Sequence, residues 1–222
     1  MASSVGMDKE FTKKVLAAAD LPVAPEVILK GRTELSEEEK QRLGLPVFVK
    51  PARGGSSIGV SKVSTWEEFP AAVALALEDD EKILVEPEIV GQEVEIGVLH
   101  YADGTLLASV PALLAGIDDS DEGFYGFDTK YLDNVVTAEI PAPFAPELTE
   151  KLRDMAIRAF EALNCEGLSR VDFFVTEDSV YINEINTLPG FTPISMYPQV
   201  LAASGVEYPA LLEALIEQAL AK

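Results

Sequence analysis

Two neighbouring apolar runs carry acidic side chains: residues 170–175 read RVDFFV, and residues 180–186 read VYINEIN. A short polar segment separates them, so the pair predicts a β-hairpin. Alternate side chains of a strand share a face, so Glu184 and Asn186 are expected to point the same way, and Asp172 joins them if the strands pair. Two carboxylates and an amide oxygen suit Mg²⁺ or Mn²⁺. A hairpin with one exposed polar face is the alternative interpretation.

A second candidate site lies nearer the N-terminus, where residues 50–59 read KPARGGSSIG after an apolar strand pattern. A lysine followed by a glycine- and serine-rich loop can present its ammonium group and backbone N–H groups to phosphate oxygens. The segment is not a Walker A loop, because Gly54 and Gly59 have the right spacing but Val60-Ser61 follows in place of Lys-Ser/Thr. A plain hairpin turn explains the same residues equally well.

Two further loops contain candidate site residues. Residues 116–131 are long, polar and glycine-bearing, with aromatic residues and Lys130. They are expected to form either a lid that closes over a reacting phosphoryl group or an ordinary surface loop. The turn at residues 186–192 follows the second acidic run, so the Gly190 N–H and Ser195 are expected near the predicted metal site.

The rest of the chain mixes helices and strands. Apolar residues at helical spacing predict helices over residues 8–19 (with Phe11 on the buried face), from Pro146 to Leu163 and over residues 208–220. Capping-box patterns predict two more helices, beginning at Ser36 and at Thr65. Asp103-Gly104 predicts a two-residue hairpin turn. Hairpins rather than strict βαβ alternation favour the α+β class.

Composition excludes several classes of protein. The chain of 222 residues carries 17 Lys and Arg against 38 Asp and Glu, a formal charge of −21. Such a charge repels phosphate backbones and anionic lipid, so nucleic acid and membrane surfaces are not expected as partners. The 48% of hydrophobic residues indicates a folded protein rather than a disordered acidic tail. No apolar run is long enough to span a membrane, and the N-terminus lacks the features of a signal peptide.

A single cysteine, Cys165, is expected to be buried, and a reducing cytoplasm is the expected compartment.

Together the motifs resemble those of the D-alanine–D-alanine ligases, members of the ATP-grasp superfamily. The segments that carry the resemblance are residues 6–9 (GMDK), 48–59, 130–132, 170–172 and 183–192. The resemblance implies an ATP-grasp fold, in which two α+β lobes sandwich the nucleotide. The expected small lobe is residues 1–92, which bind the nucleotide, and the expected large lobe is residues 93–222, which hold metal and substrate.

The resemblance also implies an activity: ATP phosphorylates the carboxylate of one D-alanine, and the amine of a second attacks the acyl phosphate, which makes D-alanyl-D-alanine for peptidoglycan precursors. It implies contacts with ATP from Lys9, Lys50, Ser56, Ser57 and Lys130 at the phosphates, Glu86 at the adenine and Glu93 at the ribose. It implies Mg²⁺ bound by Asp172, Glu184 and Asn186. The residues implied at the reacting centre are Arg170, the Gly190 N–H, Lys130, Tyr131 and Ser57, with Ser195 and Met196 at the carboxylate of the second D-alanine.

Three departures from the family pattern qualify this expectation. The resemblance covers the ATP-grasp part alone, without the N-terminal domain of the family, which contributes to the pocket for the first D-alanine and to the dimer contact. Gly126 stands where the family usually has aspartate, and residues 111–117 replace the usual Gly-Glu, with Leu113-Leu114 expected to cover surface left bare by that domain. The alternative function is therefore an ATP- and Mg²⁺-binding module with residual ATPase activity and no ligase turnover. A homo-oligomer is a further expectation.

Overall fold

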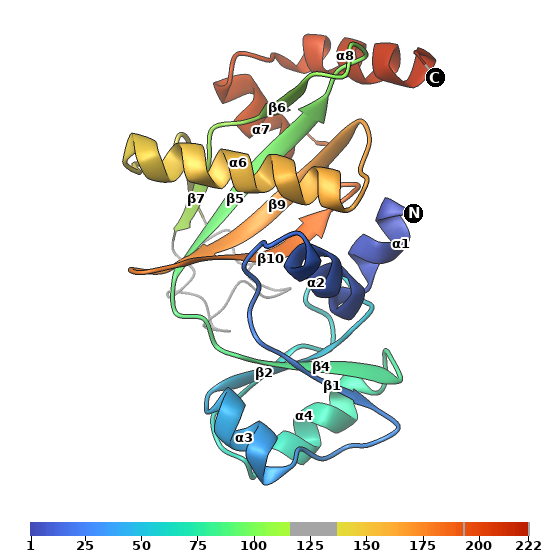
Figure 1. The fold of residues 1–222 in the computed structure, drawn as a ribbon, viewed down its shortest axis with the longest axis vertical. Coiled ribbons are helices and arrows are strands. Elements are labelled where there is room, and N and C mark those ends of the chain that lie inside the picture. The colour runs from blue at the N-terminus through green and yellow to red at the C-terminus, as the bar shows by residue number, and fades with distance from the viewer. Residues whose placement is uncertain (116–136, 193, 222) are drawn as a thin grey trace.

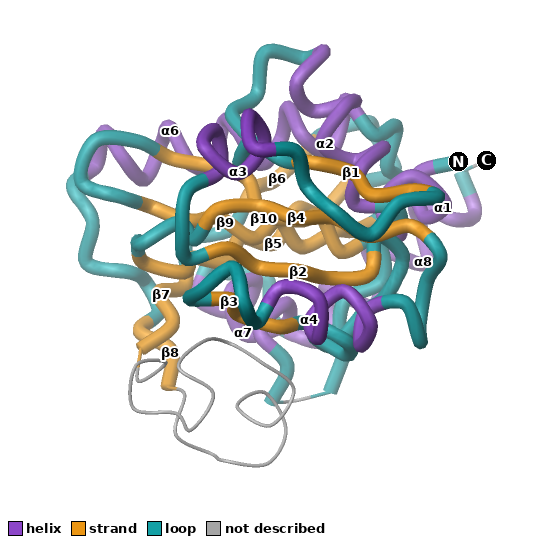
Figure 2. Tube along the Cα trace, turned by 90° about the horizontal axis from the view of Figure 1, so that it is seen from below, coloured by secondary structure: helices purple, strands orange, loops and turns teal. Residues whose placement is uncertain are grey.

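The computed structural model describes residues 1–115, 137–192 and 194–221, and it contains two antiparallel sheets, one above the other (Figure 1). Seen from the end of the small sheet, the strands of the two sheets overlap (Figure 2). The fold is therefore α+β, built from hairpins as expected. None of the described helices is long and apolar enough to cross a membrane.

The small sheet has the strand order β1-β4-β2-β3. Its strands are β1 (Val27–Lys30), β2 (Val47–Pro51), β3 (Ser61–Val63) and β4 (Lys82–Pro87), and the helices α3 (Glu37–Leu43) and α4 (Phe69–Ala76) accompany it. The capping box predicted at Ser36 is confirmed, because Ser36 Oγ accepts from Glu39 N and Glu39 Oε2 accepts from Ser36 N. The start predicted at Thr65 is wrong. The Glu68 carboxylate binds the backbone N–H groups of Ser64 and Thr65 in a turn, and α4 begins only afterwards.

The large sheet has the order β10-β9-β5-β7-β8, and β6 also pairs with β5. Its strands are β5 (Gln92–His100), β6 (Leu106–Ala108), β7 (Ala112–Ala115), β8 (Thr137–Glu139), β9 (Leu168–Val175) and β10 (Val180–Asn186). The loop between β5 and β6 spans residues 101–105, so it is longer than the two-residue turn predicted. Its shape depends on Gly104, which has a φ of 87°, and on Asp103 Oδ1, which accepts from Thr105 N.

Helices cover both faces of the large sheet. The helix α6 (Pro146–Ala162) packs on one face around Leu152, Ala156 and Phe160. The helices α7 (Met196–Ala203) and α8 (Tyr208–Leu220) pack on the other, with Tyr197 and Leu201 buried against β5. Gly97 permits this approach, because a Cβ there would lie 2.5 Å from Leu201 Cδ2.

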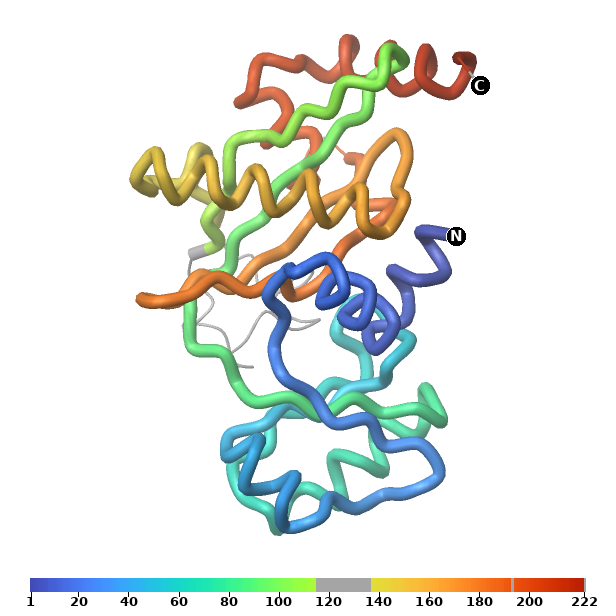
Figure 3. The backbone as a smooth tube through the Cα atoms, viewed as in Figure 1, coloured from blue at the N-terminus to red at the C-terminus, as the bar shows by residue number. Residues whose placement is uncertain are grey.

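Two N-terminal helices connect the sheets. The helices α1 (Ala2–Met7) and α2 (Lys9–Ala18) precede the small sheet in sequence, yet they lie beside the large sheet (Figure 3). Leu16 of α2 belongs to the core of the large sheet. Val23 also forms an isolated parallel bridge with Ile182 of β10. The buried face of α2 consists of Thr12, Lys13 and Leu16.

The predicted face of α2 is therefore partly wrong, because Phe11 is half exposed. Cys165 is buried as predicted, and burial raises the pKa of its thiol to about 11.

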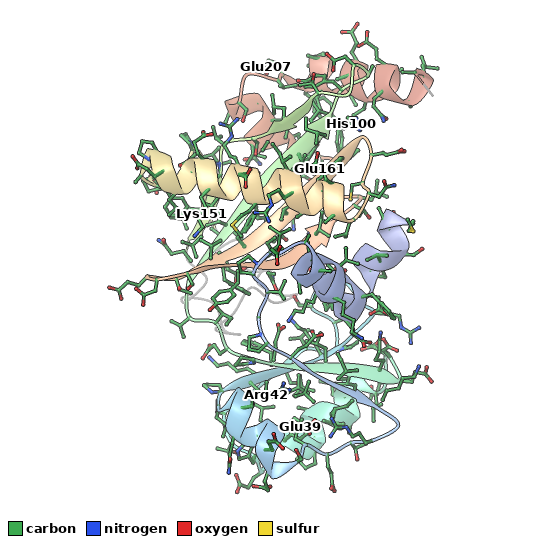
Figure 4. The ribbon with its side chains drawn as sticks, in the orientation of Figure 1. Glu39, Arg42, His100, Lys151, Glu161 and Glu207 are labelled. Atoms are coloured by element: carbon green, nitrogen blue, oxygen red, sulfur yellow. The ribbon has the colours of Figure 1, made fainter. Side chains whose placement is uncertain are left out.

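Charged side chains project from the outside of both sheets, among them Glu39 and Arg42 on α3 at the far end of the small sheet (Figure 4).

Candidate nucleotide-binding cleft

A cleft of about 480 Å³ lies between the two sheets. The small-sheet side and α2 supply Lys9, Lys50, Ser56, Ser57 and Glu86 to its lining. The large-sheet side supplies Glu93, Asp172 and Glu184. The structure thus gathers eight residues that the sequence singled out, from segments far apart in the chain.

Asp172 and Glu184 face each other across the β9–β10 hairpin. They are direct partners in the strand register, and Asn186 Nδ2 donates to Asp172 Oδ2 at 3.0 Å. Asn186 Nδ2 also lies 3.4 Å from Glu184 Oε1. The hairpin and the common face of these three side chains were predicted correctly, and the carboxylate oxygens of Asp172 and Glu184 are ligands that suit a hard cation. Among the described residues, no group of three His, Cys, Asp or Glu side chains could hold a metal. A cation bound here would therefore need the amide oxygen of Asn186 as its third protein ligand.

Arg170 lies beside this group. Its Nε and Nη2 donate to the two oxygens of Asp172, both at 2.7 Å. Its Nε also lies 3.2 Å from Glu95 Oε2 on β5. Burial alone lowers the pKa of Arg170, but Asp172 and Glu95 outweigh it and raise that pKa, so the guanidinium stays charged. Glu95 was not among the predicted site residues, although its spacing of two from Glu93 places both on one face of β5.

The loop of residues 51–59 lies across the small-sheet side of the cleft. Lys9 Nζ donates to the Gly54 carbonyl at 2.9 Å, and the Lys9 N–H donates to the Ala52 carbonyl at 2.9 Å. Ser56 and Ser57 have φ values of 53° and 57°, the left-handed region that residues other than glycine seldom adopt. Such backbone strain is found most often where a loop meets a ligand.

Ion pairs between residues far apart in the sequence, which were not predicted, hold the base of this loop. Asp80 accepts from Arg53 Nε at 3.0 Å, from Arg53 Nη2 at 2.6 Å and from the Arg53 N–H at 2.9 Å. Lys82 Nζ contacts both oxygens of Asp8 at 2.7 Å and Glu10 Oε2 at 2.8 Å. These contacts attach the loop and the start of α2 to the beginning of β4.

Glu86 lies deep in the cleft between two lysines. Lys50 of β2 and Lys13 of α2 each form an ion pair with its carboxylate. Burial by itself raises the pKa of Glu86, but the two ammonium groups outweigh it and hold the pKa at about 2. The carboxylate is therefore ionised at neutral pH. Sequence reasoning identified Glu86 and Lys50, and it missed Lys13.

The remaining predicted residues lie outside the cleft lining or outside the described residues. Ser195 Oγ accepts from the Thr192 N–H at 3.0 Å, and a Cβ on Gly190 would lie 2.9 Å from Ser195 Oγ, so the turn folds on itself. Met196 begins α7 and packs on the core of the large sheet. Lys130, Tyr131 and the predicted lid lie outside the described residues, as does Gly126.

Contrary to expectation, Leu113 and Leu114 do not cover an exposed surface. Both are buried in β7, where Leu113 pairs with Val94, and both line the cleft. They do not cover an outer surface, because the strand places them inside the large sheet.

Comparison with known proteins gives a consistent result. Residues 15–217 match the family model described as D-ala D-ala ligase C-terminus. The D-alanine–D-alanine ligase of Corynebacterium efficiens is 64% identical over 220 residues, which are 99% of this chain and 61% of that protein. The ligase of Mycolicibacterium smegmatis is 52% identical over 225 residues, covering all of this chain and 60% of that protein. The chain thus spans about three fifths of the length of the curated relatives it matches.

Solved structures match over the same part. The D-alanine-D-alanine ligase of Coxiella burnetii superposes with a TM-score of 0.84 at 37% identity, covering 99% of this chain and 58% of that one. A Bacillus anthracis ligase in complex with ATP superposes with a TM-score of 0.81 at 26% identity, covering 99% of this chain and 67% of that one. These matches confirm the predicted fold, two α+β layers of the ATP-grasp type.

Proposed function

Because the chain belongs to the family of D-alanine–D-alanine ligase C-terminal parts, we propose that it binds ATP in the cleft and catalyses ATP-dependent ligation of D-alanine to D-alanine. The observation that carries the proposal is the gathering of Lys9, Lys50 and the loop at residues 51–59 opposite Asp172 and Glu184. Ammonium groups and backbone N–H groups on one side, and carboxylates on the other, suit a triphosphate with its cation. The ATP complex of the Bacillus anthracis relative supports the same ligand.

The small-sheet side would position the nucleotide. Lys9 and Lys50 would neutralise phosphate oxygens, and Ser56 and Ser57 would donate from the loop above them. Glu86 would lie at the adenine and Glu93 at the ribose hydroxyls. In phosphoryl transfer, positioning and charge neutralisation supply most of the rate acceleration, so this chain needs no nucleophilic side chain of its own.

The large-sheet side would hold the cation and the reacting groups. Asp172, Glu184 and Asn186 would hold Mg²⁺, which when bound supplies charge neutralisation at the phosphates. A carboxylate oxygen of the first D-alanine attacks the γ-phosphorus, and ADP leaves. The amine of the second D-alanine then attacks the carbonyl carbon, and phosphate leaves. Arg170 and the Gly190 N–H would stabilise the tetrahedral oxyanion, and Ser195 and Met196 would bind the second carboxylate.

The other expectations are part of this proposal. Lys130 would reach the transferred phosphoryl group, and Tyr131 would shape the lid. Residues 1–92 and 93–222 would act as the two lobes around the nucleotide. A cytoplasmic location and a homo-oligomeric assembly stay predictions.

The test separates nucleotide binding from ligation. Calorimetry with ADP, with and without Mg²⁺, should show binding that Mg²⁺ strengthens, and absence of binding would contradict the proposal. Phosphate release should increase on addition of D-alanine and not of L-alanine, with D-alanyl-D-alanine detected by mass spectrometry. Nucleotide binding with no response to D-alanine would contradict the ligase activity and support the alternative, an isolated nucleotide-binding module.

A further inference from the structure

Lys13 is a buried lysine for which the proposed reaction has no role. Its side chain is 6% exposed, and it does not belong to the lining of the cleft. Lys13 Nζ pairs with Glu86, donates to the Ala24 carbonyl at 3.2 Å and lies 3.5 Å from Glu26 Oε2. A buried lysine needs such partners, because removing an ammonium group from water is costly. What matters for function is which of them it shares with the cleft.

Glu86 is the shared partner. Its carboxylate contacts Lys13 from α2 and Lys50 from β2 directly, whereas Glu26 lies farther from Lys13, at 3.5 Å, so two cations meet Glu86. A single ammonium group would suffice to compensate it. The second therefore leaves Lys50 able to turn toward another anion while Glu86 keeps a partner.

We propose that Lys13 is a positioning residue for nucleotide binding, which keeps Glu86 compensated when Lys50 leaves it for a phosphate oxygen of the nucleotide. The inference rests on the proposed function, since it takes Lys50 to be a phosphate ligand. Without Lys13, Lys50 would be the remaining lysine on a buried carboxylate. A phosphate would then compete with Glu86 for Lys50, and winning that competition would leave a buried charge without its partner.

The position of Lys13 suits this role. α2 packs on the core of the large sheet, whereas Glu86 belongs to β4 of the small sheet. The ion pair between Lys82 and Asp8 fixes the start of the same helix to the same strand. The position of the helix α2 thus places Lys13 beside Glu86, whether or not Lys50 also contacts Glu86.

The test measures ADP affinity by calorimetry in the presence of Mg²⁺ for the wild-type chain, Lys13→Met, Lys13→Gln and Lys13→Arg. Lys13→Met and Lys13→Gln should weaken ADP binding by roughly 10- to 100-fold, the usual effect of a hydrogen bond to a charged group. Lys13→Arg keeps the charge and should stay within about threefold of wild type. Lys14→Met is the matched control, because it removes a neighbouring lysine of the same helix whose side chain is 61% exposed. Its affinity should equal that of wild type.

Repeating the Lys13 substitution in a Glu86→Gln variant distinguishes a role in positioning the nucleotide from a purely structural role. In Glu86→Gln the carboxylate charge is absent, so adding Lys13→Met should change ADP affinity by less than about twofold. Equal losses in both backgrounds would show that Lys13 only supports the fold, and would overturn the inference. In the free protein, Lys13→Met should also slow acetylation of Lys50, measured by peptide mass spectrometry, because Glu86 then holds Lys50 alone. An unchanged or faster rate would likewise contradict it.

A failure of the proposed function would give a different result from a failure of the inference about Lys13. If the wild-type chain binds no ADP, nucleotide binding itself is wrong. If it binds ADP and every Lys13 variant binds equally well, nucleotide binding stands and the inference about Lys13 is wrong. Circular dichroism verifies that each variant is folded, and Lys13→Gln retains a donor for the Ala24 carbonyl should Lys13→Met fail to fold.

Discussion

Asp172 and Glu184 are direct partners across the β9–β10 hairpin because the strand β10 contains a bulge between Ile182 and Glu184. Val180 and Ile182 point into the core under α6, so strict alternation would send Glu184 into the same core. The additional residue, Asn183, reverses the alternation and turns Glu184 to the cleft. The acidic pair facing the cleft is therefore a product of one irregular residue.

Glu184→Gln tests the role of this pair. The substitution retains shape and removes one of two carboxylates that face each other, so a bound cation would lose a charged ligand. We expect the strengthening of ADP binding by Mg²⁺ to fall by at least about tenfold, measured by calorimetry with and without Mg²⁺. Glu177→Gln, in the exposed turn of the same hairpin, is the matched control and should behave as wild type. An unchanged response to Mg²⁺ in Glu184→Gln would remove the metal assignment.

Much of the fold could be predicted because local patterns determine it. The apolar alternation of β9 and the capping box at Ser36 each specify structure within a few residues. The common face of Glu184 and Asn186 was also correct, since both follow the bulge. The bulge itself was not predicted, although two consecutive polar residues, Asn183 and Glu184, separate the apolar Ile182 and Ile185 and so interrupt strict alternation.

The parts that sequence reasoning missed depend on partners far along the chain. Lys13 lies on the buried face of α2 because Glu86 and Glu26, more than ten residues away, compensate it. A helical pattern alone favours Phe11 as the buried residue, and Phe11 is half exposed. Asp80 likewise belongs to the acidic run of residues 78–81, a pattern typical of exposed surface, yet it is buried and pairs with Arg53. Charge pairing over long range overrides local hydropathy at these positions.

Asp80→Asn should make the thermal stability of the chain less dependent on pH in the acidic range. Burial alone raises the pKa of Asp80, but hydrogen bonds from Arg53 and the Lys82 N–H outweigh it and lower that pKa below its ordinary value. The folded state therefore gains stability from ionised Asp80 above the unfolded pKa, about 3.9, and loses it as the pH falls through the folded pKa. At pH 7, Asp80→Asn should lower the Tm, on the order of a few degrees. The difference in Tm from wild type should shrink as the pH falls toward 3.

Asp79→Asn is the control for this measurement, because Asp79 is the exposed neighbour with the same chemistry. It should leave the Tm and its pH dependence as in wild type. A Tm difference between Asp80→Asn and wild type that stays constant from pH 7 to pH 3 would mean that the charge of Asp80 contributes nothing.

Gly97→Ala should destabilise the packing of α7 on β5. The added Cβ would lie 2.5 Å from Leu201 Cδ2 and 3.1 Å from the Tyr197 ring, and both side chains are fully buried. Overpacking of this kind costs about 1–3 kcal/mol in the free energy of unfolding, which urea titration measures. Gly55→Ala meets no atom within 4 Å and controls for the substitution itself. Equal unfolding free energies for the two variants would show that α7 adjusts without cost.

Cys165 provides a direct measure of whether the core under α6 opens. It is the single cysteine of the chain and is buried, and burial raises the pKa of its thiol to about 11. The thiolate is the reactive form, so at pH 8 the folded chain should react with Ellman's reagent at least about 100-fold more slowly than the urea-unfolded chain. One thiol per chain should react after unfolding. Similar rates in the two states would mean that the end of α6 opens readily in the folded chain, and would contradict the burial of Cys165.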